Sequence, residues 1–217
     1  NSIAFSSVDS PINVLAVTSS APAEGKSTFS INLALCLAQD GQRVVVIDCD
    51  LRRPTQHRSF PTLSNEKGVS SVLSQQMGVD EALQATPHAN LFVLTAGPLP
   101  SNPGRMVESL RLRQVVNELS KRFDMVIIDA PPLLAVGDAL ALGKVARGMV
   151  LVVEWGKTTR RMLADVRARM LQANLEPLGV VLNKVDSRSG TTGYYGHYAR
   201  YYQSTDEGKK KQRRSAK

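Results

Sequence analysis

A short apolar segment followed by a glycine-containing loop places the strongest constraint on how this chain can fold. Residues 14–18 are Val-Leu-Ala-Val-Thr, and residues 20–28 continue as Ser-Ala-Pro-Ala-Glu-Gly-Lys-Ser-Thr. Residues 28–39 then place apolar side chains at helical spacing, and Gly41 is positioned to end a helix. A buried strand, a Gly-Lys-Ser loop and a helix in this order are typical of a site that binds nucleotide phosphates.

Similar apolar segments recur along the chain and alternate with amphipathic stretches. Because strands that are apolar on both faces must be covered on both faces, this alternation predicts a mostly parallel sheet with helices on either side. The expected fold class is therefore α/β, in one domain that spans residues 1–186. The expected strands are 14–18, 44–48, 91–95, 125–129, 149–153 and 178–182; the expected helices are 28–39, about 102–121 after an Asn102 cap, and 158–173, with helical turns near 69–75 and 79–84.

The composition changes at about residue 187, and residues 187–217 are expected to form a flexible tail. All the tyrosines of the chain lie in this tail: Tyr194, Tyr195, Tyr198, Tyr201 and Tyr202. Five aromatic rings in so short a segment cannot bury one another. They form either an interaction surface or a set of accessible hydroxyl groups.

The net charge of +8 is concentrated at the end of the tail. Residues 208–217 carry six Lys or Arg and no acid, whereas the rest of the chain carries 21 basic against 19 acidic side chains. The high isoelectric point is therefore a property of the tail, and no nucleic-acid partner is expected.

The loop supplies the groups that a polyphosphate needs. The backbone N–H groups of Ala23, Glu24, Gly25 and Lys26 could surround the β-phosphate at the positive end of the following helix. The Lys26 ammonium would bridge the β- and γ-phosphates, and the Ser27 hydroxyl would ligate Mg²⁺. ATP and Mg²⁺ are therefore the expected cofactors.

Three aspartates follow expected strands. Asp48 and Asp50 lie two residues apart in Val-Val-Val-Ile-Asp-Cys-Asp, and Asp129 ends Val-Ile-Ile-Asp. In open α/β sheets ligands bind beyond the carboxyl ends of the strands, so these acids should meet the loop at one edge. Such carboxylates can hold hydrated Mg²⁺ or accept a proton from an attacking hydroxyl. Asp48 and Asp129 are the expected metal ligands beside Ser27.

The loop, the segment Asp48-x-Asp50-x-Arg52 and the segment Asp129-x-Pro-Pro resemble the Walker A, Walker A′ and Walker B motifs of the bacterial tyrosine kinases. That family has a P-loop NTPase fold of the deviant Walker type, like the ParA and MinD proteins, and also ends in a tyrosine cluster. The resemblance covers about residues 12–202.

The resemblance implies a role for individual residues. Lys26, Ser27 and Thr28 would contact the phosphates and Mg²⁺. Asp48 would help to activate the acceptor hydroxyl, Asp50 would stabilise the site and Asp129 would assist the metal. Arg52 would add a positive contact in the site or across a subunit interface, and Asn183 would contact the purine.

The resemblance also implies an ATP-dependent tyrosine kinase that phosphorylates its own tail, between the subunits of a ring-shaped homo-oligomer of the full protein. Its implied partner is a transmembrane adaptor, or polysaccharide co-polymerase region, at the cytoplasmic face of the cell membrane. Its implied role is in the synthesis and export of capsule or exopolysaccharide.

The residues leave two other functions open. A spatial-organiser ATPase of the MinD or ParA kind shares the fold, but it carries a further lysine where this chain has Ala21 and it lacks the terminal tyrosines. A scaffold without catalytic activity would bind partners through its aromatic and basic tail. The presence of Lys26 and all three aspartates argues against that second alternative.

Overall fold

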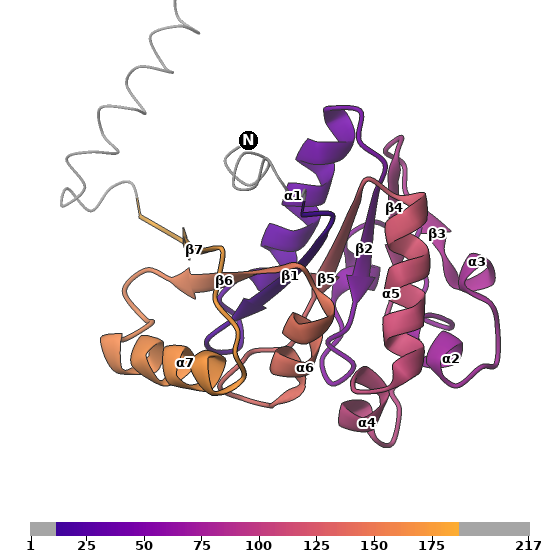
Figure 1. Ribbon diagram of the computed structural model, residues 1–217. Helices are drawn as coiled ribbons and strands as arrows, with labels where there is room; N and C mark the ends of the chain where they lie inside the picture. Colours follow the sequence, from indigo (N-terminus) through magenta and orange to yellow (C-terminus); the bar gives the residue numbers. More distant parts are fainter. Residues whose placement is uncertain (1–11, 187–217) are drawn as a thin grey trace, which may run out of the picture. The chain divides into compact units, whose positions relative to one another are not determined.

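The structure, a computed structural model, describes residues 12–186. Its strands form a seven-stranded sheet in the order β3-β4-β2-β5-β1-β6-β7 (Figure 1). Only the pairing of β3 with β4 is antiparallel; all other pairings within these residues are parallel. The α/β fold with a mostly parallel sheet is confirmed.

The chain divides into a compact unit that ends at Asn183 and a second unit that begins at Lys184. The tail that the sequence predicts, with its five tyrosines, lies outside the described residues, and the domain boundary after residue 186 stays a prediction.

The central strands are apolar because both of their faces are covered. Every residue of β1, β2 and β5 is buried. The expected ranges 44–48 and 125–129 agree with the observed strands, and the ends of the other expected strands differ by at most one residue. The strands are β1 Val14–Ser19, β2 Val44–Asp48, β3 Gln84–Ala85, β4 Leu91–Leu94, β5 Met125–Asp129, β6 Gly148–Glu154 and β7 Gly179–Asn183.

Helices cover both faces of the sheet. The helix α1 packs Ile31, Ala34 and Ala38 against one face, and α5, α6 and α7 contribute to the larger core on the other face. Sequence patterns did not predict η1, α6 or β3. The helices are α1 Lys26–Gln39, the 3-10 turn η1 Gln56–Arg58, α2 Val69–Leu73, α3 Val79–Ala82, α4 Pro103–Val107, α5 Leu110–Arg122, α6 Asp138–Val145 and α7 Arg160–Gln172.

The single helix expected over residues 102–121 is wrong, because the chain forms two helices there, α4 and α5. Asn102 caps α4 as expected, since its side chain accepts a hydrogen bond from the Arg105 N–H. The break comes at Ser109, whose hydroxyl accepts a hydrogen bond from the Leu112 N–H at 3.2 Å. A serine that caps a new helix in this way favours an extended conformation for its own backbone, which ends the preceding helix.

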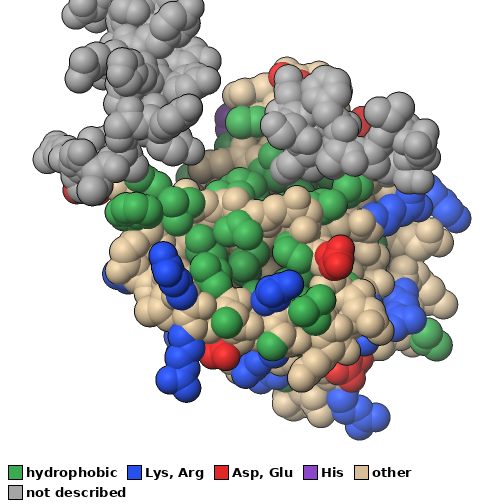
Figure 2. Space-filling model, turned by 60° about the vertical axis from the view of Figure 1, so that its left-hand side comes forward, with side chains coloured by type: hydrophobic (Ala, Val, Ile, Leu, Met, Phe, Trp, Pro, Cys, Tyr) green, Lys and Arg blue, Asp and Glu red, His purple; other side chains and the backbone are tan. Residues whose placement is uncertain are grey.

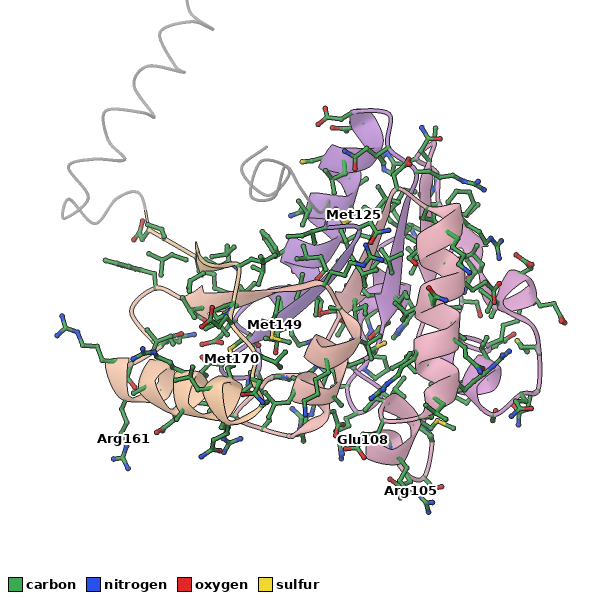
Figure 3. All side chains as sticks on the ribbon, in the orientation of Figure 1. Arg105, Glu108, Met125, Met149, Arg161 and Met170 are labelled. Atoms are coloured by element: carbon green, nitrogen blue, oxygen red, sulfur yellow. The ribbon has the colours of Figure 1, made fainter. Side chains whose placement is uncertain are left out.

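The helix α7 packs on the sheet through a narrow apolar stripe. Val166 and Met170 are its buried residues, and Met170 belongs to the same core as Met149 of β6 (Figure 3). Arg161, in the first turn of the helix, points away from the body of the unit (Figure 3). The charged face of α7 is therefore exposed to solvent.

The strand β7 forms one edge of the sheet and exposes apolar side chains. Leu178, Val180 and Leu182 are each more than two-fifths exposed, as is Trp155 after β6. Figure 2 brings this side of the unit forward and shows hydrophobic side chains gathered among Lys and Arg. None of the helices within residues 12–186 has the length and apolar character needed to cross a membrane.

Strand register brings the expected site together. β5 lies between β2 and β1, so the last residues of β2 and β5 are direct neighbours: Asp48 is paired with Asp129. β1 pairs with β5 on its other side and leads into the loop that precedes α1. The two carboxylates and the loop therefore meet at one edge of the sheet, as the sequence predicts.

Candidate functional site

The loop between β1 and α1 adopts a tight conformation with left-handed backbone at two positions. Ala23 has φ of 66° and Gly25, the residue before α1, has φ of 95°. Glycine suits this second position because a β-carbon at Gly25 would lie 2.1 Å from Nδ2 of Asn183. Successive amides in such a turn form a concave surface that binds anions, and the N-terminus of α1 adds its positive dipole.

The Glu24 side chain holds the loop closed from the inside. Its carboxylate is buried and accepts hydrogen bonds from the Ser20 hydroxyl at 2.6 and 2.8 Å and from the Ala21 N–H at 2.9 Å. The Thr158 hydroxyl, which follows β6, donates to the same carboxylate. Glu24 thus contributes its backbone to any phosphate site, while its side chain fastens the loop to the sheet.

Asn183 lies beside the loop at the end of β7. Its side-chain amide donates a hydrogen bond to the Glu24 carbonyl at 2.9 Å. The asparagine that the resemblance assigns to the purine therefore also supports the backbone of the phosphate loop.

A buried charge cluster lies next to the loop. The Nζ atom of Lys26 is 2.9 Å from Oδ2 of Asp50 and 3.6 Å from Oδ1 of Asp129. Lys26 is 8% exposed, Asp50 is 4% exposed, and Asp48 and Asp129 are fully buried. The four side chains that the sequence proposes as catalytic are therefore gathered in one place.

Burial and mutual repulsion shift the protonation of the acids. Burial, followed by the charge of Asp129, raises the pKa of Asp48 to about 7. Burial also raises the pKa of Asp129, although Lys26, Ser27 and Gln56 oppose that shift. Burial alone would lower the pKa of Lys26, but attraction to Asp129 and then Asp50 outweighs it and raises that pKa.

The Asp48 carboxylate also organises the segment that follows β2. Its Oδ1 atom accepts a hydrogen bond from the Asp50 N–H at 3.2 Å. Its Oδ2 atom accepts from the N–H groups of Thr55 and Gln56 at 3.0 and 2.9 Å. Asp48 is thus held in place by backbone groups at the wall of the site.

Arg52 pairs with Asp138 at the start of α6. Its guanidinium donates to Asp138, with Nε 2.9 Å from Oδ2 and Nη2 3.4 Å from Oδ1. The hydrogen bond to Asp138 raises the pKa of Arg52 further. The pair joins the segment after β2 to the start of α6, and the nucleotide contact that the sequence suggests for Arg52 stays a prediction.

The cluster suits a hydrated Mg²⁺ that is shared with a polyphosphate. The Oδ1 atom of Asp129 is buried and has no hydrogen-bond partner within residues 12–186, and the Ser27 hydroxyl interacts with the same carboxyl group. In this range no group of three or more His, Cys, Asp or Glu side chains could hold a metal alone. Mg²⁺ ordinarily takes one or two protein oxygens and completes its shell with phosphate and water, so Ser27, Asp129 and Asp48 fit this mode.

A groove opens beside Ser27 and Thr28 on the outer side of α1. It has a volume of about 350 Å³ and runs between α1 and the segment that follows η1. Its lining combines apolar and polar groups: Ser27, Thr28, Ile31, Asn32, Leu35, Thr55, Arg58, Ser59 and Phe60.

Known proteins share this arrangement. A family model described as "AAA domain" matches residues 12–158. The tyrosine-protein kinase YwqD of Bacillus subtilis (strain 168) is 42% identical over 195 residues, which make up 89% of this chain and 82% of YwqD. The chain belongs to the bacterial tyrosine kinase family. It is accordingly a protein-tyrosine kinase, as the sequence predicted.

The three-dimensional likeness extends to the kinase domain of the Escherichia coli tyrosine kinase ETK. That structure is 35% identical, with a TM-score of 0.79 over 82% of this chain and 70% of that one. Against the whole tyrosine-protein kinase etk of E. coli (strain K12), at 34% identity, the chain covers 27% of the relative's length. This chain thus corresponds to one part of that longer kinase.

The cell division ATPase MinD of Pyrococcus furiosus shares only the fold. Its structure has a TM-score of 0.68 at 24% sequence identity, over 82% of this chain and 74% of that one. The predicted deviant P-loop fold is thereby confirmed, while the spatial-organiser function is not favoured.

Some residues of the kinase site could not be found by motif. Thr158, Gln56 and Asp138 touch Glu24, Asp129 and Arg52 respectively, from segments distant in the chain. None of these three residues belongs to the motifs named above, because their contacts arise from the folding of separate segments onto one edge.

Proposed function

We propose that this kinase transfers the γ-phosphoryl group of ATP to the tyrosines of its own C-terminal cluster, from one subunit to the next. The cluster consists of Tyr194, Tyr195, Tyr198, Tyr201 and Tyr202. The observation that carries the proposal is the packing of Lys26 against Asp50 and Asp129 beside the loop, with Asp48 paired to Asp129.

Each residue of the cluster has a place in this reaction. Backbone amides of Ala23, Glu24, Gly25 and Lys26 would bind the phosphates, and Thr28 at the first turn of α1 would add its hydroxyl. Lys26 would turn from the acids to the β- and γ-phosphates. Mg²⁺, held by Ser27, Asp129 and Asp48, supplies positive charge that offsets the charge of the phosphates.

Asp48 is the carboxylate placed to accept the proton of the attacking phenol. A phenol has a pKa of about 10, so it is a weak nucleophile near neutral pH. Phosphoryl transfer depends mainly on positioning and on neutralising charge, and a base need only take the proton as the new bond forms. Asp50 would hold Lys26 in reach of the phosphates.

The groove beside α1 gives an acceptor tyrosine a route toward Asp48. Its lining combines the apolar Ile31, Leu35 and Phe60 with Ser27 and Thr55, and the Thr55 N–H donates to Asp48. A groove that offers both apolar and polar groups suits a phenol ring. We therefore expect the ring to pack on Phe60 and Ile31 while its hydroxyl faces Asp48.

Replacing Phe60 by alanine is expected to raise the KM for a tyrosine peptide about three- to tenfold, since one aromatic contact contributes about 0.5–1.5 kcal/mol. The KM for ATP should stay within about twofold. Steady-state kinetics with a peptide of residues 193–203 measures both constants. His88 packs on Phe60, with ring centroids 5.4 Å apart, yet does not line the groove, so His88→Ala is the matched control. An unchanged peptide KM in Phe60→Ala would show that the acceptor binds elsewhere.

Transfer between subunits can be tested because every tyrosine of the chain lies in the cluster. Wild-type chain incubated with Mg²⁺ and ATP should gain phosphate masses by intact-mass measurement, and a variant with all five tyrosines changed to phenylalanine should gain none. Mixing that variant, as donor, with Lys26→Met chain, as acceptor, should phosphorylate the acceptor. Release of free phosphate without any gain of mass would favour the organiser ATPase instead.

We further propose that the reaction regulates capsule or exopolysaccharide synthesis and export at the cytoplasmic face of the cell membrane. The expected partners are further copies of the kinase in a ring and a transmembrane adaptor or co-polymerase region, with no nucleic acid.

A further inference from the structure

Gln56 occupies the centre of the site although no motif includes it. It is the first residue of η1 and is fully buried. It lies between the start of α1 and the end of β5, the two elements that carry Ser27 and Asp129.

Both the nitrogen and the oxygen of the Gln56 side-chain amide make hydrogen bonds in this site. Its Nε2 atom donates to Oδ2 of Asp129 at 2.8 Å and to the Ser27 carbonyl at 3.1 Å. Its Oε1 atom accepts a hydrogen bond from the Ser59 hydroxyl at 2.9 Å. Because the Ser27 carbonyl and the Asp129 carboxylate accept hydrogen bonds, the amide nitrogen is the end that faces them, and the Ser59 hydroxyl donates to Oε1.

The Gln56 backbone extends the same connection to the second acid. Its N–H donates to Oδ2 of Asp48 at 2.9 Å, next to the Thr55 N–H on the same oxygen. One buried residue therefore contacts all three of the residues that we propose as metal ligands, with Ser27 contacted through its backbone carbonyl.

We propose that Gln56 is the positioning residue of the Mg²⁺ site, which it serves by fixing the Asp129 carboxylate and the Ser27 end of α1 relative to each other. With Oδ2 of Asp129 bound to Gln56, Oδ1 is the oxygen left without a hydrogen-bond partner among the described residues. The proposal rests on the proposed function, because it concerns the metal of that reaction.

The chemistry of an amide suits this role. A carboxylate that binds a metal is usually oriented by a hydrogen bond to its other oxygen, and loss of such a partner lowers metal affinity or activity about 10- to 100-fold. Gln56 donates without bringing positive charge, so the acids keep the negative charge that attracts a divalent cation. A lysine or arginine in its place would compete with the metal.

The test compares ADP binding with and without Mg²⁺ in the full chain. Titration calorimetry gives the dissociation constant of ADP in EDTA and in excess Mg²⁺. The first constant divided by the second, here the Mg²⁺ ratio, measures how much the metal strengthens ADP binding. In Gln56→Met, which keeps the length of the side chain but loses its hydrogen bonds, we expect this ratio to fall about tenfold or more. The ADP affinity in EDTA should stay within about twofold, because the phosphate loop is intact. Mn²⁺ binding to the ADP complex, followed by electron paramagnetic resonance, should weaken by the same factor.

Two further variants separate positioning from general loss of structure. Gln84 also makes several hydrogen bonds, to both backbone groups of Ser64 and to the Thr95 hydroxyl, but far along the chain from the site residues. Gln84→Met should leave the Mg²⁺ ratio unchanged. Ser59→Ala removes only the hydroxyl that donates to Oε1 of Gln56 and helps to hold the amide in place. It should lower the Mg²⁺ ratio about two- to fivefold with the fold retained.

The outcomes are distinct. A wild-type Mg²⁺ ratio in folded Gln56→Met would overturn the inference and leave the proposed function standing. If Gln56→Met does not fold, Ser59→Ala decides, and an unchanged ratio there overturns the inference. Wild-type chain that binds ADP equally well in Mg²⁺ and EDTA would overturn the proposed use of the metal together with the inference.

Discussion

Replacing Lys26 by methionine is expected to lower the rate of tyrosine phosphorylation about 10²- to 10³-fold or more. A positioned cation that meets developing charge in a buried site contributes about 3–4 kcal/mol to the transition state. Lys26 is 8% exposed and its ammonium lies within 3.6 Å of both Asp50 and Asp129, so neither solvent nor another described side chain is placed to replace it. Phosphotyrosine formed per minute in Mg²⁺ and ATP, by quantitative immunoblot or intact mass, gives the rate.

The same substitution should lower stability only moderately. It leaves two buried carboxylates without their cation, but Asp129 can take up a proton, as its raised pKa already indicates. Lys121→Met, on the exposed last turn of α5, is the matched control and should retain wild-type rate. Activity within about threefold of wild type in a folded Lys26→Met chain would refute the assignment of Lys26 to the phosphates.

Replacing Gly68 by alanine is expected to destabilise the fold strongly. A β-carbon there would lie 2.0 Å from the Thr95 carbonyl oxygen and 2.5 Å from the Gly97 nitrogen. Both are backbone atoms of the segment that follows β4, and they are held close because the Val69 N–H donates to the Thr95 carbonyl at 2.8 Å. Overpacking against backbone costs about 3 kcal/mol or more, which corresponds to a fall in Tm of about 6–12 °C for a unit of this size.

Gly78 supplies the matched control, since it also precedes a short helix. A β-carbon at Gly78 would meet only the Glu81 Oε1 atom, at 3.5 Å, which is an ordinary contact. Thermal unfolding followed by circular dichroism should therefore show Gly78→Ala within about 1 kcal/mol of wild type. Equal Tm values for Gly68→Ala and Gly78→Ala would mean that the close crossing of α2 and β4 does not exist in solution.

The charge cluster that we propose as catalytic could be predicted from sequence because it lies at strand ends. The segments that end in Asp48 and Asp129 are continuous apolar runs, and such runs become parallel strands whose carboxyl ends share an edge. The loop before Lys26 follows another such strand. The three elements therefore meet whatever the details of the packing, and the structure confirms that Lys26 lies against the acids.

The prediction of a single helix over residues 102–121 failed for a local reason. Helical periodicity continues through that range, but Ser109 caps a second helix and interrupts the first. A hydroxyl that can hydrogen-bond either forward or to solvent gives no clear pattern in sequence. The partner of Arg52 was not predicted either, because Asp138 comes from a helix, α6, that periodicity did not predict.

By itself, then, the amino-acid sequence determined the α/β class, the phosphate loop, the three acids and the kinase family, because these depend on apolar periodicity and on residues close together in the chain. Only the tertiary structure decided which groups support them. Gln56 bridges Asp129 and Ser27, Thr158 fastens Glu24, and Gly68 passes against β4. The physical reason is that hydrogen bonds and close packing between segments 29 to 134 residues apart depend on how loops fold over the sheet edge, which no local pattern encodes.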